Sequence, residues 1–242
     1  MSRDPQYEAP FAWWGPGWQA SATRNMAELL RDETIDAWTA ANLWAALARR
    51  RSLAVVAGAS GVGKTTLLTA LLDFLPQGTR RIYVRGCFET FAFLADPTIN
   101  PGETALLINE LSPHLPVYLW GPAVGRVLEA TQRGFSLLAT AHAESVYDLV
   151  GALTGSPLHI AASRTAALEF VVAMGLDDES VSGRRIRRVW RLAPTREGVV
   201  VTELGRGIVE ENYISQETPP QHPGPATWFP SPELARRRSI LE

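Results

Sequence analysis

The chain has 242 residues, of which 46% are hydrophobic and 20% charged, the balance of a soluble globular domain with a full core. Its formal net charge of -2 does not indicate nucleic acid or a membrane surface as a partner. A single cysteine, Cys87, excludes an internal disulfide and fits a reducing cytoplasm, and no apolar run reaches the roughly 20 residues that a membrane-spanning helix needs.

The first 24 residues are rich in proline, glycine and tryptophan and lack the apolar stretch of a secretory signal peptide. Three aromatic residues favour burial of this segment against protein: Trp13, Trp14 and Trp18. We interpret residues 1–24 as an arm packed on its own domain, with docking on a neighbouring subunit as the alternative. Residues 25–50 carry two short helical patterns and are predicted to be a helical lead-in to a domain spanning residues 25–214.

An alternation of strands and helices begins at residue 53. Residues 53–57 are a short apolar run, typical of a strand buried on both faces, and the loop 58–63 leads into a predicted helix over 65–74. The alternation continues with predicted strands over 81–85, 105–109 and 135–139 and a helix over 124–131. This pattern predicts an α/β fold with a mostly parallel sheet and helices on both faces.

The pattern changes again after residue 160. Strand-like runs over 168–174, 188–192 and 198–202, with turn pairs at Ser182-Gly183 and Glu197-Gly198, predict a small β-rich part at the C-terminal end of the domain. Beyond Ser215 the chain is rich in proline, so residues 215–242 are expected to be an extended or disordered tail.

Residues 58–65 read Gly-Ala-Ser-Gly-Val-Gly-Lys-Thr and match the P-loop pattern G-x-x-x-x-G-K-[ST] in full. Glycines let the backbone approach phosphates closely, and the start of the following helix favours negative charge. Lys64 supplies a cation for the β- and γ-phosphates, and the Thr65 hydroxyl is suited to coordinate Mg²⁺. The predicted strand before the loop and the helix after it give the motif the context that it requires.

The motif predicts that the chain binds a nucleoside triphosphate, which we take to be ATP with Mg²⁺. The residues expected to hold it belong to the loop and the first turn of the helix: Gly58, Ser60, Gly61, Val62, Gly63, Lys64, Thr65 and Thr66.

An acidic residue is predicted at the end of the strand over 105–109. Residues 106–110 read Leu-Leu-Ile-Asn-Glu, and the acid falls at the sheet edge where open α/β folds bind ligands. Glu110 is therefore the candidate for orienting or deprotonating the attacking water and for helping Thr65 to hold the metal. Asn109 stands where most P-loop ATPases have an aspartate. The alternative is a solvated glutamate at a strand end.

Two more polar residues follow predicted strands at the same edge. His142 follows the strand over 135–139 and could contact the γ-phosphate, although a single histidine is more often structural. Glu89 follows the strand over 81–85 and is by itself an ordinary acid near the phosphate edge. The basic clusters over 184–188 and 236–238 are interpreted as solvated.

Together these motifs resemble the secretion ATPases of type II and type IV secretion, type IV pilus assembly and tight-adherence pilus systems. Glu89 falls at the end of the family's Asp box, Glu110 at its Walker B motif and His142 in its His box, and the likeness covers residues 25–205. Residues 183–189, Gly-Arg-Arg-Ile-Arg-Arg-Val, resemble the family's G-x-R-x-v stretch. The resemblance implies a RecA-like P-loop NTPase domain in which Glu110, Glu89 and His142 are catalytic.

The chain departs from this family in three places. Arg85 and Gly86 replace the acids before Glu89, and Leu-Ser-Pro-His follows Glu110 where the family has an arginine and acidic residues. Only residues 1–52 precede the first strand, so most of the family's arginine-bearing N-terminal domain has no counterpart. We therefore expect slow turnover or arginines supplied by a partner, and three residues are candidates in a neighbouring subunit: Arg80, Arg126 and Arg133.

The resemblance implies an ATP-hydrolysing motor subunit that forms a homo-oligomeric ring, a hexamer, and acts on a membrane platform protein of a secretion or pilus machine. It also implies a cytoplasmic protein, held at the inner membrane through a partner. The alternatives are a nucleotide-gated regulatory subunit with little hydrolysis, a small-molecule kinase and a DNA-linked ATPase. The missing acids after Glu110 favour the first of these, and the net charge gives no support to nucleic-acid binding.

Overall fold

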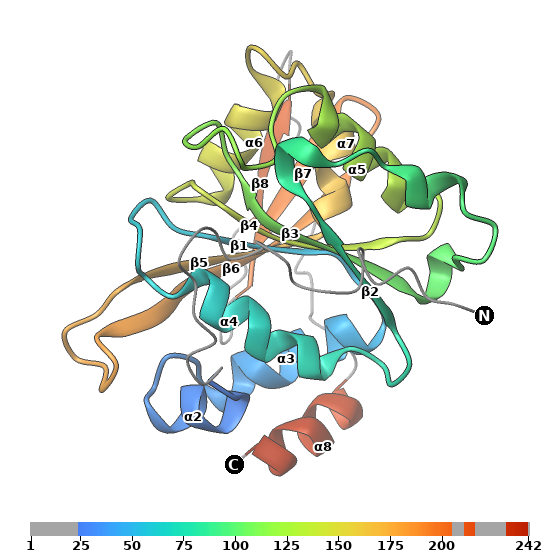
Figure 1. Ribbon diagram of the computed structural model, residues 1–242. Helices are drawn as coiled ribbons and strands as arrows, with labels where there is room; N and C mark the ends of the chain where they lie inside the picture. The colour runs from blue at the N-terminus through green and yellow to red at the C-terminus, as the bar shows by residue number, and fades with distance from the viewer. Residues whose placement is uncertain (1–23, 205–210, 216–230, 242) are drawn as a thin grey trace.

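The computed structural model describes residues 24–204, 211–215 and 231–241. Its central element is one sheet of eight strands in the order β2-β3-β4-β1-β5-β6-β7-β8. Figure 1 shows helices α2, α3, α4 and α8 on one face of the sheet and α5, α6 and α7 on the other. The predicted α/β fold with helices on both faces is confirmed. The arm with its three tryptophans lies outside the described residues, and its role stays a prediction.

The first five strands form the parallel half of the sheet. Their bounds are β1 (Leu53–Val56), β2 (Arg80–Val84), β3 (Thr104–Leu111), β4 (Ser136–Ala141) and β5 (Phe170–Leu176). Strand β1 pairs with β4 and β5, and β3 pairs with β2 and β4, all in parallel. Strand β4 thus separates the strand before the P-loop from the strand that carries Glu110.

The predicted β-rich C-terminal part extends the same sheet in antiparallel fashion. Its strands are β6 (Arg184–Pro194), β7 (Gly198–Glu203) and β8 (Glu211–Ser215). Each pairs antiparallel with the strand before it, starting from β5. The β5–β6 turn ends at Gly183, whose φ of 68° lies in the left-handed region that glycine tolerates best.

Helices connect many of the strands along the chain and cover both faces of the sheet. The α-helices are α2 (Met26–Arg31), α3 (Ala37–Ala48), α4 (Lys64–Leu71), α5 (Pro122–Gln132), α6 (Val146–Thr154), α7 (Ala162–Thr165) and α8 (Ser231–Leu241). Short 3₁₀ turns are η1 (Leu72–Phe74), η2 (Gly86–Phe88), η3 (Ala92–Ala95), η4 (Pro101–Glu103) and η5 (Ala166–Leu168). The helical lead-in that the sequence predicts over residues 25–50 consists of α2 and α3. Helix α2 begins with a capping box, in which Asn25 and Glu28 bond each other's backbone N–H groups at 3.0 and 2.8 Å.

Apolar clusters bury both faces of the sheet. Strand β1 shows why: its alternate side chains enter opposite clusters, Ala54 and Val56 on the α5–α6 side and Leu53 and Val55 on the α3–α4 side. All four residues are fully buried. This two-sided burial explains the continuous apolar run in the sequence and fixes the strand that leads into the P-loop.

Helix α8 corrects part of the expectation for residues 215–242, of which 216–230 and 242 lie outside the described residues. Residues 231–241 are helical rather than extended or disordered, and they contact α3. The Arg237 guanidinium lies 4.7 Å from the centre of the Trp44 ring, which stacks in turn on Phe74 at 5.2 Å. None of the helices in the described part of the chain has the length and apolar character needed to cross a bilayer.

Candidate functional site

The predicted site residues follow parallel strands and meet at one edge of the sheet. The loops after β1, β3 and β4 and the β5–β6 hairpin emerge together on the left-hand side of Figure 1. This is the carboxyl edge, because all four preceding strands run in the same direction. The edge therefore joins residues that are far apart in the sequence.

The loop over residues 57–63 joins β1 to α4, as the motif requires. Gly61 and Gly63 have φ values of 75° and 97°, which few residues other than glycine adopt at low cost. Gly63 is the N-cap of α4 and provides no side-chain cap, so the N–H groups of the first helical turn are free to meet an anion. The local backbone fits a phosphate cradle.

Lys64 and Glu110 lie together at this edge. The Nζ atom of Lys64 is 3.8 Å from Oε1 of Glu110. Both side chains are largely buried, with exposed fractions of 8% and 13%. Burial weakens screening, so each charge acts strongly on its partner and on any phosphate that enters.

The pairing of β3 with β4 is irregular where Glu110 lies. The register of β3 against β4 shifts between Ile108 and Leu111, and such an irregularity redirects the side chains beside it. The Leu119 N–H donates to the Glu110 carbonyl at 3.1 Å and ties the returning loop to the strand end. Nearby, burial raises the pKa of Tyr118, and the Glu110 carboxylate raises it further.

His142 is half-buried and contacts a second histidine. The rings of His142 and His114 have centroids 4.1 Å apart and are tilted by 40°. The Ser112 hydroxyl accepts from the His114 N–H at 3.0 Å and lies 3.2 Å from its Nδ1. This contact was not predicted from the sequence, because nothing in the spacing links residues 114 and 142.

Glu89 holds its own loop. Its Oε2 accepts from the Arg85 N–H at 3.0 Å, and its Oε1 accepts from the Phe91 N–H at 2.7 Å. Phe91 has a φ of 61°, so these bonds support a conformation that is unfavourable for an aromatic residue. With both oxygens engaged by backbone, Glu89 ranks behind Glu110 as a candidate catalytic acid.

Glu144 lies against the first glycine of the P-loop, a contact that no sequence motif indicates. A Cβ atom added at Gly58 would be 2.4 Å from Cγ of Glu144 and 2.9 Å from its Oε1. The loop after β4 therefore closes directly onto the start of the phosphate cradle.

The residues at this edge fit Mg²⁺-ATP. In the described part of the chain no three histidine, cysteine or acidic residues are grouped to hold a metal ion. A magnesium ion would therefore depend on phosphate oxygens together with the Thr65 hydroxyl and Glu110, which is how Mg²⁺ usually binds beside nucleotides. Thr65 is half-buried at the start of α4, as that role needs.

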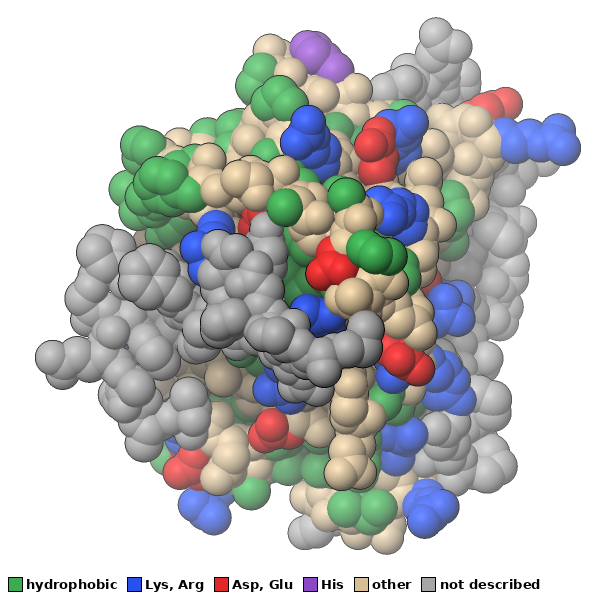
Figure 2. Space-filling view, turned by 45° about the vertical axis from the view of Figure 1, so that its right-hand side comes forward, with side chains coloured by type: hydrophobic (Ala, Val, Ile, Leu, Met, Phe, Trp, Pro, Cys, Tyr) green, Lys and Arg blue, Asp and Glu red, His purple; other side chains and the backbone are tan. Residues whose placement is uncertain are grey.

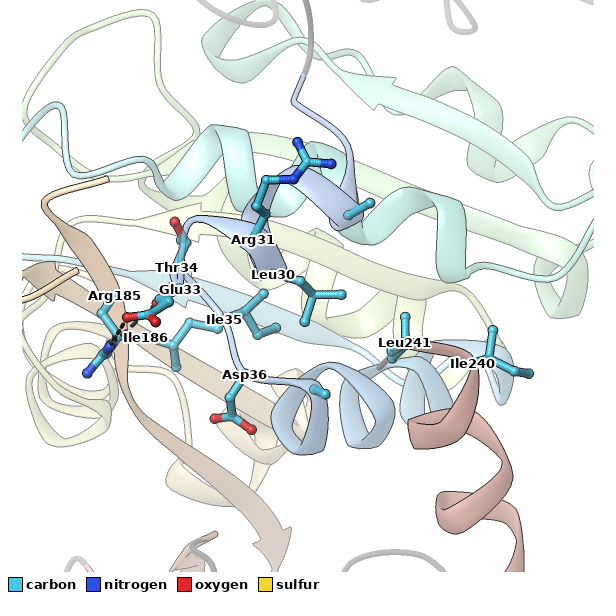
Figure 3. Close-up of a pocket in the computed structure, with 12 residues that line it drawn as sticks. Leu30, Arg31, Glu33, Thr34, Ile35, Asp36, Arg185, Ile186, Ile240 and Leu241 are labelled. Carbon is cyan, nitrogen blue, oxygen red and sulfur yellow. Dashed lines mark hydrogen bonds and ion pairs between the residues drawn. The ribbon is translucent and has the colours of Figure 1, made fainter. Parts of the chain in front are cut away.

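A separate pocket of about 790 Å³ lies between the α2–α3 loop, β6 and the end of α8 (Figure 3). Its labelled lining mixes apolar and charged side chains: Leu30, Arg31, Glu33, Thr34, Ile35, Asp36, Arg185, Ile186, Ile240 and Leu241. No P-loop residue and no candidate catalytic residue lines it. On the face in Figure 2, acidic side chains are interspersed among basic ones.

No protein-family model matches the chain, and no curated protein matches it. Among solved structures, the chain is similar to the VirB11 ATPase from the Brucella suis type IV secretion system. That match has a TM-score of 0.45 and 22% sequence identity over 62% of this chain and 52% of that chain. It is also similar to the Legionella pneumophila ATPase DotB, with a TM-score of 0.37 and 15% identity over 76% of this chain and 51% of that chain. The chain thus spans about half the length of either protein. Because both TM-scores are below 0.5, we infer function from the residues of this chain.

Proposed function

We propose that the chain is an ATPase that binds Mg²⁺-ATP on residues 58–66 and hydrolyses it with the help of Glu110. One observation carries the proposal: the Lys64 ammonium and the Glu110 carboxylate lie 3.8 Å apart, at the ends of two strands that β4 separates. A phosphate-binding cation and a candidate base thus share one largely buried site. That arrangement suits transfer of a phosphoryl group to water.

Each residue then has a distinct task. The loop N–H groups and the start of α4 bind the phosphates, and Lys64 binds the β- and γ-phosphates. The Thr65 hydroxyl, with Glu110 nearby, would hold Mg²⁺, and the ion would supply positive charge next to the transferred group. Glu110 orients the attacking water or accepts its proton, and partial burial beside Lys64 holds its carboxylate in place.

His142 gives the first prediction, because its loop lies beside the Glu110 loop through the contact with His114. We propose that His142 contacts the γ-phosphate side of the site. His142→Ala should slow ATP turnover by about tenfold or more, since a group that acts in the transition state is lost, while ADP affinity stays nearly unchanged. Steady-state phosphate release and ADP titration measure the two effects.

His159→Asn is a matched control for that prediction. It removes an imidazole from an exposed position outside the site, and asparagine tolerates the positive φ of 47° found there. His159→Asn should leave turnover unchanged. Equal turnover in His142→Ala and the wild-type chain would make His142 a structural residue.

We further propose that the chain acts as a motor subunit of a homo-oligomeric ring, a hexamer, in the cytoplasm, working on a membrane platform protein of a secretion or pilus machine. The order of the P-loop, Glu89, Glu110 and His142 along the chain supports this, as does an edge site that a neighbour can close. In such rings an arginine of the neighbour stabilises the charge that develops on the phosphoryl group.

If ATP is hydrolysed between subunits of a ring, ATP turnover per chain depends on the protein concentration. Turnover per chain should rise as the protein is concentrated and level off as rings form, and ATP bound between subunits should favour the ring by linkage. Phosphate release and mass, measured over the same concentrations with and without ATP, check this. A constant rate per chain from a protein that stays monomeric in ATP would contradict the ring.

A nucleotide-gated regulatory subunit with little hydrolysis is the second candidate. It is favoured by Asn109, which replaces the usual acid before Glu110, and by the Leu-Ser-Pro-His stretch that follows. The Asn109 backbone also accepts a hydrogen bond from the Thr140 hydroxyl, which supports the strand end but adds no charge. Tight ATP binding without phosphate release at any protein concentration would favour this candidate.

A further inference from the structure

Residues 184–188 of the β5–β6 hairpin include four arginines, and three of them are paired. Arg185 lies 3.2 Å from Glu33 and 3.5 Å from Asp177, and Arg187 lies 3.4 Å from Asp177. Arg188 lies 3.3 Å from Glu203. The fourth, Arg184, forms no ion pair with any residue in the described ranges. Arg184 therefore differs from the three arginines near it, each of which forms an ion pair.

The Arg184 side chain lies against the P-loop. A Cβ atom added at Gly63 would be 3.5 Å from Cδ of Arg184 and 3.8 Å from its Nη1. Met174 borders the same glycine, with its Cε at 3.6 Å from that point. Since Gly63 caps α4 immediately before Lys64, the Arg184 guanidinium lies beside the turn that is built to receive phosphates.

Hydrogen bonds fix the backbone from which Arg184 projects. The Ser180 hydroxyl, which is buried, accepts from the Arg184 N–H at 2.8 Å and lies 3.0 Å from the Arg184 carbonyl. The hairpin is tied to the α2–α3 loop as well, because the Ile186 N–H donates to the Thr34 carbonyl at 2.9 Å. Figure 3 shows Thr34 and Ile186 beside the ion pair of Arg185 with Glu33.

We propose that Arg184 is a nucleotide-binding residue that contacts the α- and β-phosphates from within the same chain. The glycine-rich part of a P-loop cradles those two phosphates, whereas the lysine reaches the β- and γ-phosphates. An arginine beside Gly63 therefore meets the phosphates that ADP and ATP share. Its planar fork of donors suits two phosphate oxygens at once. This inference rests on the proposed nucleotide site.

Arg184 is expected to differ from the other site residues because its substitution should weaken ADP binding. Arg184→Ala should raise the Kd of ADP and of ATP by the same factor, about tenfold or more, because one charge-assisted contact is lost from both complexes. Arg184→Lys should recover part of the affinity, since charge returns without the fork. His142 and Glu110 variants should not weaken ADP binding in this way.

Titration of Mg²⁺-ADP and Mg²⁺-ATP into the full chain tests the proposal. Arg188→Ala is the matched control: it removes an arginine from the same strand, paired only with Glu203 among the described residues, and should change either Kd by less than about twofold. Thermal unfolding checks that each variant is folded, and Arg184→Gln replaces any variant that is not.

Three outcomes overturn the inference. Wild-type affinity in Arg184→Ala, alongside a loss of binding in Lys64→Ala, would leave the P-loop in place and make Arg184 a solvated residue. Equal weakening by Arg184→Ala and Arg188→Ala would assign the effect to the overall charge of the hairpin. A wild-type chain that binds neither nucleotide would overturn the proposed function and this inference together.

Discussion

Lys64→Ala is expected to weaken ATP binding by roughly a hundredfold, because the substitution deletes the cation that faces the β- and γ-phosphates. Lys64 is the only lysine in the chain and is largely buried at the start of α4. Among the described residues, Lys64 is the basic residue that forms an ion pair with Glu110. No other side chain in the described ranges therefore supplies a positive charge next to Glu110 when Lys64 is replaced. Titration of Mg²⁺-ATP into the variant measures the loss.

Lys64→Met separates charge from packing. It keeps a long apolar side chain in the same buried position and removes only the ammonium, so it should lose as much ATP affinity as Lys64→Ala. Its thermal unfolding shows whether the fold survives with Glu110 left unpaired. ATP bound by both variants with wild-type affinity would show that the P-loop is not the nucleotide site.

The single lysine offers a second readout on the wild-type chain. An amine-reactive reagent can modify only Lys64 and the α-amino group, and peptide mapping tells the two apart. Bound nucleotide covers Lys64 in the proposed site, so ATP should slow its modification while modification of the α-amino group continues. Equal rates with and without ATP would contradict contact between Lys64 and the phosphates.

Glu110→Gln should keep ATP binding and lower hydrolysis by about a hundredfold or more, the effect expected when a general base is lost. Glutamine has nearly the same shape, so it preserves packing at the end of β3 while removing the carboxylate. Single-turnover phosphate release, measured with ATP bound at saturation, separates the chemical step from binding.

Glu89→Gln is the matched control, since it makes the same chemical change in the other candidate acid. Its carboxylate bonds the N–H groups of Arg85 and Phe91, so its loss should loosen the loop and affect turnover less than Glu110→Gln. The reverse ranking, with normal turnover in Glu110→Gln and a large loss in Glu89→Gln, would move the catalytic role to Glu89.

Elements with a strong local pattern could be predicted from the sequence. The β1–loop–α4 unit was predicted because an apolar run, a glycine-rich loop and a helix follow one another directly. Strands β2 to β4 were predicted from their short strand-like runs within an alternation of strands and helices. Helix α6 (Val146–Thr154) was missed because a nine-residue helix has few turns over which to show periodicity. Helix α8 was missed because the prolines before it suggested a tail.

Only the part of the candidate site that lies in one continuous stretch of the chain could be predicted from the sequence. The P-loop residues are contiguous, so a pattern identifies them. The approach of Lys64 to Glu110, and of Arg184 to Gly63, depends on the strand order, which no local spacing reveals. The cluster over 184–188 was therefore interpreted as solvated, although one of its arginines lies against the P-loop.

Phosphate release from ATP by the purified full chain tests most directly whether the chain is an ATPase that uses this P-loop. We expect release that requires Mg²⁺, that rises per chain with protein concentration, and that is lost in Lys64→Met. Absence of release at every concentration, or release that Lys64→Met leaves unchanged, would contradict an ATPase built on this P-loop.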